Sequence, residues 1–338
     1  MTSKFTKLFL LALFAATSTF AQDIHFSQYN ASPLSLNPAL TGNFSCTYRG
    51  GINYRNQWNS VTTPYVTYSA FFDMPVLTIG SGDVLGAGLY IFNDKSGDGN
   101  LSNLSVLASA AYHKSLFGGN HSVSLGVQLG LSRKQIDKEQ LFFGNQFDGT
   151  DFDQNLPSNE PWAEENFNNF DFNAGLVWKS AFSDNMGLEA GAAFYHLTTP
   201  KETFFTGDSE NDLGMRYVLH SRFRYAVTDN ISILPTFLFM TQSKAMEANF
   251  GSEVNYHLDK GNFKATILGG LYYRWDDALI IEAGIDYSNF RFAFSYDVNT
   301  SSLTEASNGK GGFELSLIYK GCILPVAPDK FVMPCPRM

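Results

Sequence analysis

The feature that most constrains the fold is an alternation of apolar and polar residues near the C-terminal end of the chain. Between Ile281 and Tyr287 every second residue is apolar. The same alternation returns at 290–298 and at 313–319. A period of two indicates β-strands, because successive side chains of a strand point to opposite faces. Each of these segments is therefore predicted to be a strand with one apolar and one polar face.

The aromatic content of the apolar faces distinguishes two ways of burying such strands. In a soluble sandwich the buried face would carry mainly Val, Ile and Leu, but here it carries Tyr287, Phe290, Phe292 and Phe294. Transmembrane barrels place apolar residues outward and polar residues inward, with aromatic girdles near the strand ends. An aromatic content of 15% and 29 glycines fit that class. The predicted fold is all-β, a transmembrane antiparallel β-barrel.

Similar segments recur along most of the chain and predict about 14 strands, an even number as in single-chain bacterial barrels. Those preceding the three strands above are expected at 47–58, 64–73, 84–94, 101–114, 122–134, 170–179, 186–197, 213–227, 231–241, 247–258 and 263–275. Pro235 falls inside the ninth of them. Because proline cannot donate to a β-ladder, it predicts either a local bulge or a lateral gap in the wall.

The connections between these segments differ in length on the two sides of the predicted barrel. If the N-terminus is periplasmic, the periplasmic turns are short and rich in Gly, Asn and Asp, whereas the outer loops include the long breaks at 135–169, 198–212 and 300–309. Barrels of this class show the same asymmetry. The exception is 74–83, a longer stretch on the expected periplasmic side.

The N-terminal residues carry targeting information. Lys4 and Lys7 precede an apolar run, and Ala21 is placed for signal-peptidase cleavage, so a secretory signal peptide is expected. Pro33 and Pro38 interrupt the segment that follows, which is expected to pack in or under the barrel as a latch or periplasmic segment. The predicted organisation is a signal peptide at 1–21, the latch at 22–42, the barrel at 43–321 and a periplasmic tail at 322–338.

The net charge and the cysteine content further limit which partners and which protein classes fit this chain. The formal net charge of −9 disfavours nucleic acid as a partner. The three cysteines, Cys46, Cys322 and Cys335, are too few for a disulfide scaffold. Cys322 and Cys335 could form a disulfide across the tail in an oxidising envelope, leaving Cys46 unpaired; the alternative is that both thiols are free.

No catalytic or cofactor motif appears in the sequence. There is no GxSxG, HExxH, Walker loop or CxxC, and the six histidines are scattered without metal-ligand spacing. The acidic runs at 93–100 and 148–155 lack the final Glu of an EF-hand and are expected to be solvated loops. We therefore expect no enzyme activity, cofactor or metal; the alternative is a barrel-wall serine hydrolase.

The long outer loop at 135–169 is the best candidate for protein recognition. Aromatic residues anchor interfaces, and loops carry function. Acidic and aromatic residues are mixed there, and the predicted partner-binding residues are Asp151, Phe152, Asp153, Trp162 and Phe167.

Several segments together resemble the PorP/SprF family of type IX secretion system outer-membrane proteins from Bacteroidetes. They are FSQYNASPLSLNPALTG at 26–42, YRNQW at 54–58 with Pro64 shortly after, NDKSG at 93–97, SYDVNTSSL at 295–303, GGFELSLIY at 311–319, and Cys-Pro-Arg at 335–337. The first of these segments is the most specific.

The resemblance implies a non-enzymatic component of protein secretion or gliding motility in the cell outer membrane. Its implied partners are outer-membrane lipid, a secreted adhesin-like surface protein or its C-terminal domain, and periplasmic components of the secretion machinery. Two alternatives stay open at this point: a channel for hydrophobic or small solutes, since barrels of about 14 strands include fatty-acid channels, and an outer-membrane lipid hydrolase.

Overall fold

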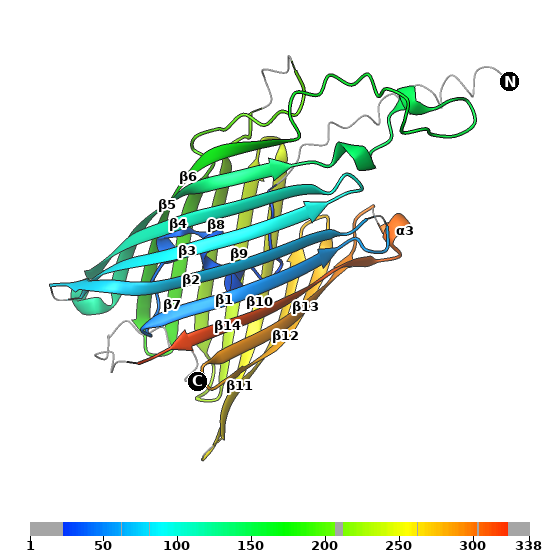
Figure 1. Ribbon diagram of the computed structural model, residues 1–338. Helices are drawn as coiled ribbons and strands as arrows, with labels where there is room; N and C mark the ends of the chain where they lie inside the picture. The colour runs from blue at the N-terminus through cyan, green and yellow to red at the C-terminus, as the bar shows by residue number, and fades with distance from the viewer. Residues whose placement is uncertain are drawn as a thin grey trace.

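The computed structural model describes residues 23–323 except 62, 81, 207–211, 262 and 303. Fourteen antiparallel strands form one closed barrel, because β1 (Tyr48–Gln57) pairs with both β2 (Tyr65–Ile79) and β14 (Lys310–Gly321) (Figure 1). The other strands are β3 (Asp83–Ser96), β4 (Leu101–Leu116), β5 (His121–Gln135), β6 (Asn166–Ser183), β7 (Met186–Tyr195), β8 (Arg216–Ala226), β9 (Ile231–Gln242), β10 (Ala245–Lys260), β11 (Phe263–Arg274), β12 (Ala278–Tyr287) and β13 (Phe290–Asn299). The predicted fold class is confirmed.

The alternation in the sequence becomes an outer apolar face and an inner polar face. Ile281 and Phe292 are about half exposed on the outside, whereas Asp286 and Ser295 of the same two strands are buried inside. Each predicted strand has a counterpart in the structure. In the part of the chain that the structure describes, no helix is long and apolar enough to cross a membrane.

Two strands, β2 and β6, extend furthest beyond their predicted ranges. β2 continues to Ile79 and pairs with β3, so most of the expected break at 74–83 is strand. A register shift between Pro75 and Leu77 accommodates the proline, whose missing N–H is tolerated at such an irregularity. β6 begins at Asn166, before the predicted start at 170, and pairs with the end of β5.

Pro235 produces neither a bulge nor an opened wall. β9 keeps one register against β10 through the Pro235–Ser252 pair. On its other side the ladder with β8 is interrupted between the Arg222–Thr236 and Tyr225–Ile233 pairs, but the register is the same before and after. The proline therefore interrupts the pairing locally, and the two strands stay adjacent.

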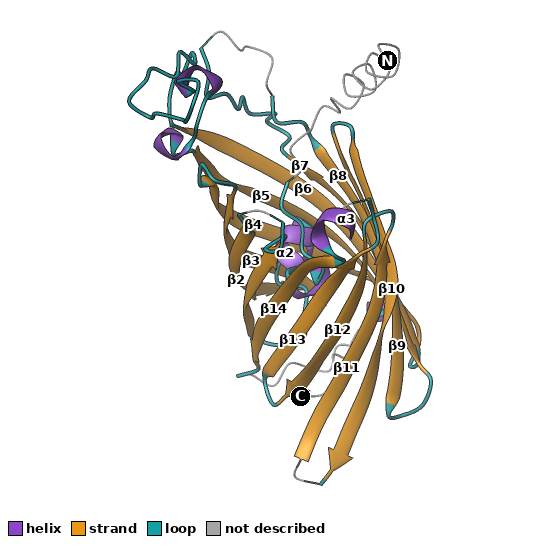
Figure 2. Cartoon of the chain, turned by 90° about the vertical axis from the view of Figure 1, so that its right-hand side faces the viewer, coloured by secondary structure: helices purple, strands orange, loops and turns teal. Residues whose placement is uncertain are grey.

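The two ends of the barrel differ, as the lengths of the connections predicted (Figure 2). One end, called here the long-loop end, carries the β5–β6, β7–β8 and β13–β14 connections, with α3 (Thr304–Ser307) in the last of them. The other, called the short-turn end, carries tight turns such as η3 (Phe117–Gly119).

Residues 23–42 fold back into the lumen, and we call this segment the plug. It contains three short helical turns, η1 (Tyr29–Ala31), α2 (Pro33–Leu36) and η2 (Pro38–Leu40), and Figure 2 shows α2 enclosed by the strands. Leu34 and Ala39 are fully buried. The segment therefore lies inside the barrel (Figure 2). The chain runs from Asp23 near the long-loop end to β1 at the short-turn end.

The disulfide differs from the predicted one. Cys46 is bonded to Cys322 with a Cα–Cα distance of 4.5 Å, so the predicted Cys322–Cys335 bridge and an unpaired Cys46 are wrong. The reason is barrel closure: Tyr48 pairs with Gly321, which brings the residues just before β1 and just after β14 together. Cys335 lies outside the described residues.

Candidate functional site

A buried charged cluster fixes Ser27 and Gln28 of the plug to the barrel wall. The carboxylate of Glu314 accepts the backbone N–H groups of Ser27 at 2.6 Å and Gln28 at 2.8 Å, and it forms an ion pair with Arg55. The hydroxyl of Ser27 donates to Asp297 at 2.7 Å, and Arg274 pairs with Asp297 at 3.1 Å. Removing one partner from such a buried ion pair costs about 3 to 5 kcal/mol, because a charge is left uncompensated. The wall therefore determines the position of the plug.

Asp23 and His196 form a second contact where the plug begins. His196, the first residue after β7, lies between the carboxylates of Asp23 and Asp171, with Arg216 3.5 Å from Asp23. Burial by itself lowers the pKa of His196, but the charge of Asp23 and the hydrogen bonds to Asp171 and Asp23 outweigh it and raise the pKa to about 9. The imidazole is therefore protonated at neutral pH, and the contact is an ion pair.

The η2 turn of the plug packs against β4, β5 and β6. The side chain of Asn37 accepts the N–H of Ala39 at 2.9 Å and donates to the carbonyls of Leu176 and Ala192, both at 3.1 Å. Gly126 faces the backbone of η2 so closely that a Cβ atom there would overlap Ala39. A glycine is therefore required at position 126, where β5 contacts η2.

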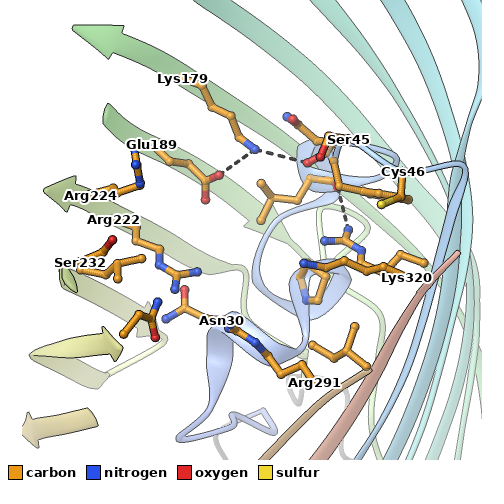
Figure 3. Close-up of a pocket in the computed structure, with 18 of the residues that line it drawn as sticks. Asn30, Ser45, Cys46, Lys179, Glu189, Arg222, Arg224, Ser232, Arg291 and Lys320 are labelled. Atoms are coloured by element: carbon orange, nitrogen blue, oxygen red, sulfur yellow. Dashed lines mark hydrogen bonds and ion pairs between the residues drawn. The ribbon is translucent and has the colours of Figure 1, made fainter. Parts of the chain in front are cut away.

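Beneath the plug lies a cavity of about 1210 Å³, which we call the vestibule. Its lining includes Gly119, Asn185 and Thr228, from three turns of the short-turn end, so it opens at that end. Figure 3 shows Arg222 and Arg224 on one side of it and Lys320 on the other. Part of the plug, including Asn30, forms its roof.

The charged groups of the vestibule are held by carboxylates in the wall. Arg222 pairs with Glu253 at 3.1 Å, and Arg291 pairs with Asp286 at 2.6 Å. Lys179 pairs with Glu189, which also lines the cavity, at 2.9 Å. These pairs restrict the rotamers of the long basic side chains.

The long-loop end carries the predicted partner-binding residues, but in two separate aromatic groups. The tip group consists of Phe142, Phe147 and Phe152, whose ring centroids are 5.2 to 5.8 Å apart for the contacting pairs. The base group consists of Phe143, Trp162, Phe167, Phe204 and Phe205. Phe152 therefore belongs to the tip group, whereas Trp162 and Phe167 belong to the base group.

Sequence reasoning missed the second loop of the base group. Trp162 packs on Phe205 with a centroid distance of 4.8 Å, and Phe167 packs on Phe204 at 5.0 Å. Phe204 and Phe205 come from the β7–β8 connection, which the sequence places far from the β5–β6 loop. Their adjacency in the sequence, in a predicted outer loop, was the only signal that could have indicated them.

The acidic residues of the tip stabilise the loop itself. The carboxylate of Asp148 accepts the N–H groups of Asp151 at 2.9 Å and Thr150 at 2.7 Å, which lowers the pKa of Asp148. The predicted residues Asp151 and Asp153 accept the N–H groups of Phe152 and Asn155. Among the described residues, no three His, Cys, Asp or Glu side chains gather as metal ligands.

Two histidines that contact serine hydroxyls, His113 and His257, have no carboxylate partner among the described residues that would complete a catalytic triad. The Nδ1 atom of His113 lies 2.7 Å from the hydroxyl of Ser124, but its Nε2 atom contacts the carbonyl of Thr41 at 2.8 Å, where a triad has a carboxylate. His257 lies between Ser232 and Thr266 in the same manner.

Comparison with known proteins places this architecture among outer-membrane proteins. A family model described as "Type IX secretion system membrane protein PorP/SprF" matches residues 18–319. A Pseudomonas aeruginosa FadL homologue has a TM-score of 0.50 at 12% identity, covering 91% of this chain and 96% of that one. The P. putida toluene transporter TodX has a TM-score of 0.50 at 10% identity, with 86% and 93% covered. Both show a similar fold. No curated protein sequence matches this chain.

Proposed function

This chain belongs to the PorP/SprF family of type IX secretion system membrane proteins, and we propose that it supports the export or surface anchoring of a secreted partner protein without catalysing a reaction. The protein is an outer-membrane β-barrel component of that system. The finer role, a receptor or anchor for one secreted protein such as an adhesin, is the proposal.

The observation that carries this proposal is a plugged lumen below an exposed aromatic surface. A polypeptide cannot pass through a lumen that the plug occupies with buried ion pairs, so a partner must be held rather than conducted. The rings of Phe142, Phe147 and Phe152 are about half exposed although they pack on one another, and contiguous exposed apolar surface marks interaction sites. Such rings act as anchors when a partner protein covers them.

The proposed orientation places the long-loop end outside the cell and the short-turn end in the periplasm. The length asymmetry of the connections supports it, since outer-membrane barrels have short periplasmic turns. The C-terminal tail follows β14 at the short-turn end, where periplasmic machinery could reach it.

The test of partner anchoring is made in cells of the native species that lack this chain. Surface and medium proteomes first identify the proteins that disappear from the surface on deletion. The chain is then restored as wild type, as the double variant Phe147→Ser with Phe152→Ser, or as Phe117→Ser. Phe117 is a matched control, because it is 83% exposed but lies in a turn at the opposite end.

We expect the tip variant to insert normally but to release the partner from the surface by at least about tenfold, as for the loss of two anchors of an interface. The Phe117→Ser control should retain it. Surface levels that are equal in both variants would contradict the role of the tip group.

A second test removes the tail. Truncation after Ile323 deletes 324–338 and keeps the Cys46–Cys322 disulfide. We expect barrel insertion to continue and partner export to fail. If export continues at the wild-type level, the tail is not the contact with the machinery.

A channel for hydrophobic or small solutes is the second candidate. It is favoured by the vestibule and by the likeness of the fold to a toluene transporter. Single-channel recording of the purified chain in planar bilayers separates the two: steady, ungated conductance supports the channel, and a closed barrel supports the anchor.

A further inference from the structure

The vestibule presents cations to its interior and keeps most of their counter-ions behind them. Arg222 and Arg291 have side chains that are 21% and 15% exposed, whereas the side chains of their partners Glu253 and Asp286 are each 3% exposed. Arg49 shows the same arrangement over the fully buried Asp73. The wall carboxylates orient these guanidinium groups, which line the cavity together with Lys179, Lys264 and Lys320. The acidic residues of the lining are Glu189, Asp229 and Asp259. An entering anion therefore meets positive charge that is already in position.

Several of these groups have hydrogen-bonding capacity left over. Among the residues that the structure describes, Arg224 has no carboxylate partner, and its Nη1 atom makes a long contact of 3.4 Å with the carbonyl of Asp184. The Nε atom of Arg222 is buried without a hydrogen-bond partner among the described residues. The same holds for Oδ1 of Asn255, a residue that lines the cavity and is 2% exposed. Leaving a buried polar group without a hydrogen-bond partner costs free energy. A polar ligand that supplies the missing hydrogen bonds would therefore be favoured at this wall.

The positions of the cations indicate an extended ligand. Arg222 and Arg224 come from β8, Arg291 from β13 and Lys320 from β14. Arg222 and Arg291 both approach the carboxylate of Glu253, at 3.1 and 3.9 Å, so these two cations lie close together. Figure 3 shows Arg224 and Lys320 on opposite sides of the space. A compact anion such as phosphate needs converging donors, whereas a chain with several carboxylates can meet separated ones.

The remaining lining suits a polypeptide backbone. Hydroxyl and amide side chains, such as Ser115, Ser232 and Asn30, lie among the cations and can bond peptide groups. The volume of about 1210 Å³ is above the range of about 300 to 1,000 Å³ that is usual for small-molecule sites. The closed sheet separates the cavity from membrane lipid, so a ligand enters through the short-turn end.

We propose that the vestibule is a binding site for an acidic segment of a polypeptide that enters from the short-turn end, with Arg222, Arg224, Arg291 and Lys320 as the contacts for its carboxylates. The inference deepens the proposed function, on which it rests for the source of the peptide: a protein of the secretion route on the periplasmic side. The aromatic tip and the vestibule are then separate sites at opposite ends of one barrel.

The test is direct binding to the full chain in detergent micelles. The probe is a fluorescein-labelled peptide of alternating Asp and Gly, compared by anisotropy with the same peptide carrying Asn in place of Asp. We expect only the Asp peptide to bind, with an affinity that falls as salt rises. Arg224→Gln should weaken binding about tenfold, as expected for the loss of one charge-assisted contact, and Arg224→Glu should abolish it.

Arg224 is the residue to change because no carboxylate within the described part of the chain pairs with it, so the fold is kept. The matched control is Arg133→Gln, which removes an exposed arginine outside the lumen and should leave binding unchanged. Heat-shifted mobility on gels confirms that each variant is folded.

Equal binding of the Asp and Asn peptides would overturn the inference, and so would equal binding by wild type and Arg224→Glu. Displacement of the peptide by anionic lipid at a lower concentration than by unlabelled peptide would also overturn it. Peptide binding that appears only after truncation at Ile323 would make the chain's own tail the occupant and would also overturn it. The assay needs no secretion, so its failure leaves the anchoring tests unaffected, and a failed anchoring test leaves the binding result standing.

Discussion

The guanidinium of Arg55 pairs with the carboxylate of Glu314 directly across the junction of β1 and β14, although the two residues are 259 positions apart in the sequence. The same carboxylate accepts two backbone N–H groups of the plug. One side chain therefore links the closure of the barrel to the position of the plug. A change there should affect both.

Glu314→Gln should loosen the plug and weaken the barrel. Arg55 would keep only Asp297, at 3.6 Å, as a counter-charge, so we expect a loss of about 3 kcal/mol of unfolding free energy. Urea unfolding in lipid vesicles measures the loss, and planar-bilayer recording should show conductance that the wild type lacks. Glu305→Gln, an acid in the β13–β14 loop, is the control. Wild-type conductance in Glu314→Gln would show that the plug does not depend on this carboxylate.

Gly126→Val should displace the plug without breaking the wall. Its Cβ would overlap the backbone of η2, which cannot move while Asn37 is bonded to the wall. We expect protease sensitivity within 23–42 in folded, membrane-inserted protein. Gly269→Val is the matched control, because it is also a strand glycine but has no atom within 4 Å of the added carbon. Equal protection of residues 23–42 from protease in both variants would contradict the proposed contact between Gly126 and η2.

Cys46→Ser should lower the thermal stability of the oxidised protein, whereas Cys335→Ser should not. The Cys46–Cys322 bond joins residues 276 positions apart, and cross-links over long loops contribute about 2 to 5 kcal/mol, mainly by restricting the unfolded chain. Differential scanning calorimetry with and without reductant measures the effect. Peptide mapping under non-reducing conditions should recover the Cys46–Cys322 pair, and a Cys322–Cys335 pair would contradict the structure.

Stability should fall between neutral pH and about pH 10 because His196 loses its proton. The pKa of His196 is raised to about 9 from an ordinary value near 6.5, so its contribution is complete below about pH 6.5 and lost as the pH rises through about 9. The shift corresponds to an effect on the order of 3 kcal/mol. Thermal midpoints from pH 6 to 10 should therefore fall more steeply in the wild type than in His196→Gln. His121→Gln, which changes the first residue of β5 at the short-turn end, should keep the wild-type slope.

Most of the wall was predictable because alternation is a local property of the sequence. Ile281 and Phe292 point outward as the period of two required, and the strand number and the asymmetry of the two ends followed from the same pattern. The prediction was wrong at 74–79, which was expected to belong to a connection at 74–83 but is part of β2. Pairing with the neighbouring β3 extends β2 to Ile79. That pairing depends on a second strand, so the residues of β2 alone do not reveal it.

The candidate sites were predictable only in part. The aromatic and acidic composition of the β5–β6 loop pointed to a surface, but Phe204 and Phe205 joined it from another loop. The vestibule had no sequence signal, because Arg222, Arg291 and Lys320 are separated in the chain and share a cavity only through barrel closure.

The sequence by itself determined that this chain would form strands with one apolar and one polar face, because side-chain direction alternates along each strand whatever surrounds it. The tertiary structure alone decided which cysteines pair, where the plug rests and which cations share the vestibule. Those features depend on contacts between residues hundreds of positions apart, and such contacts exist only once β1 has paired with β14 and enclosed a lumen.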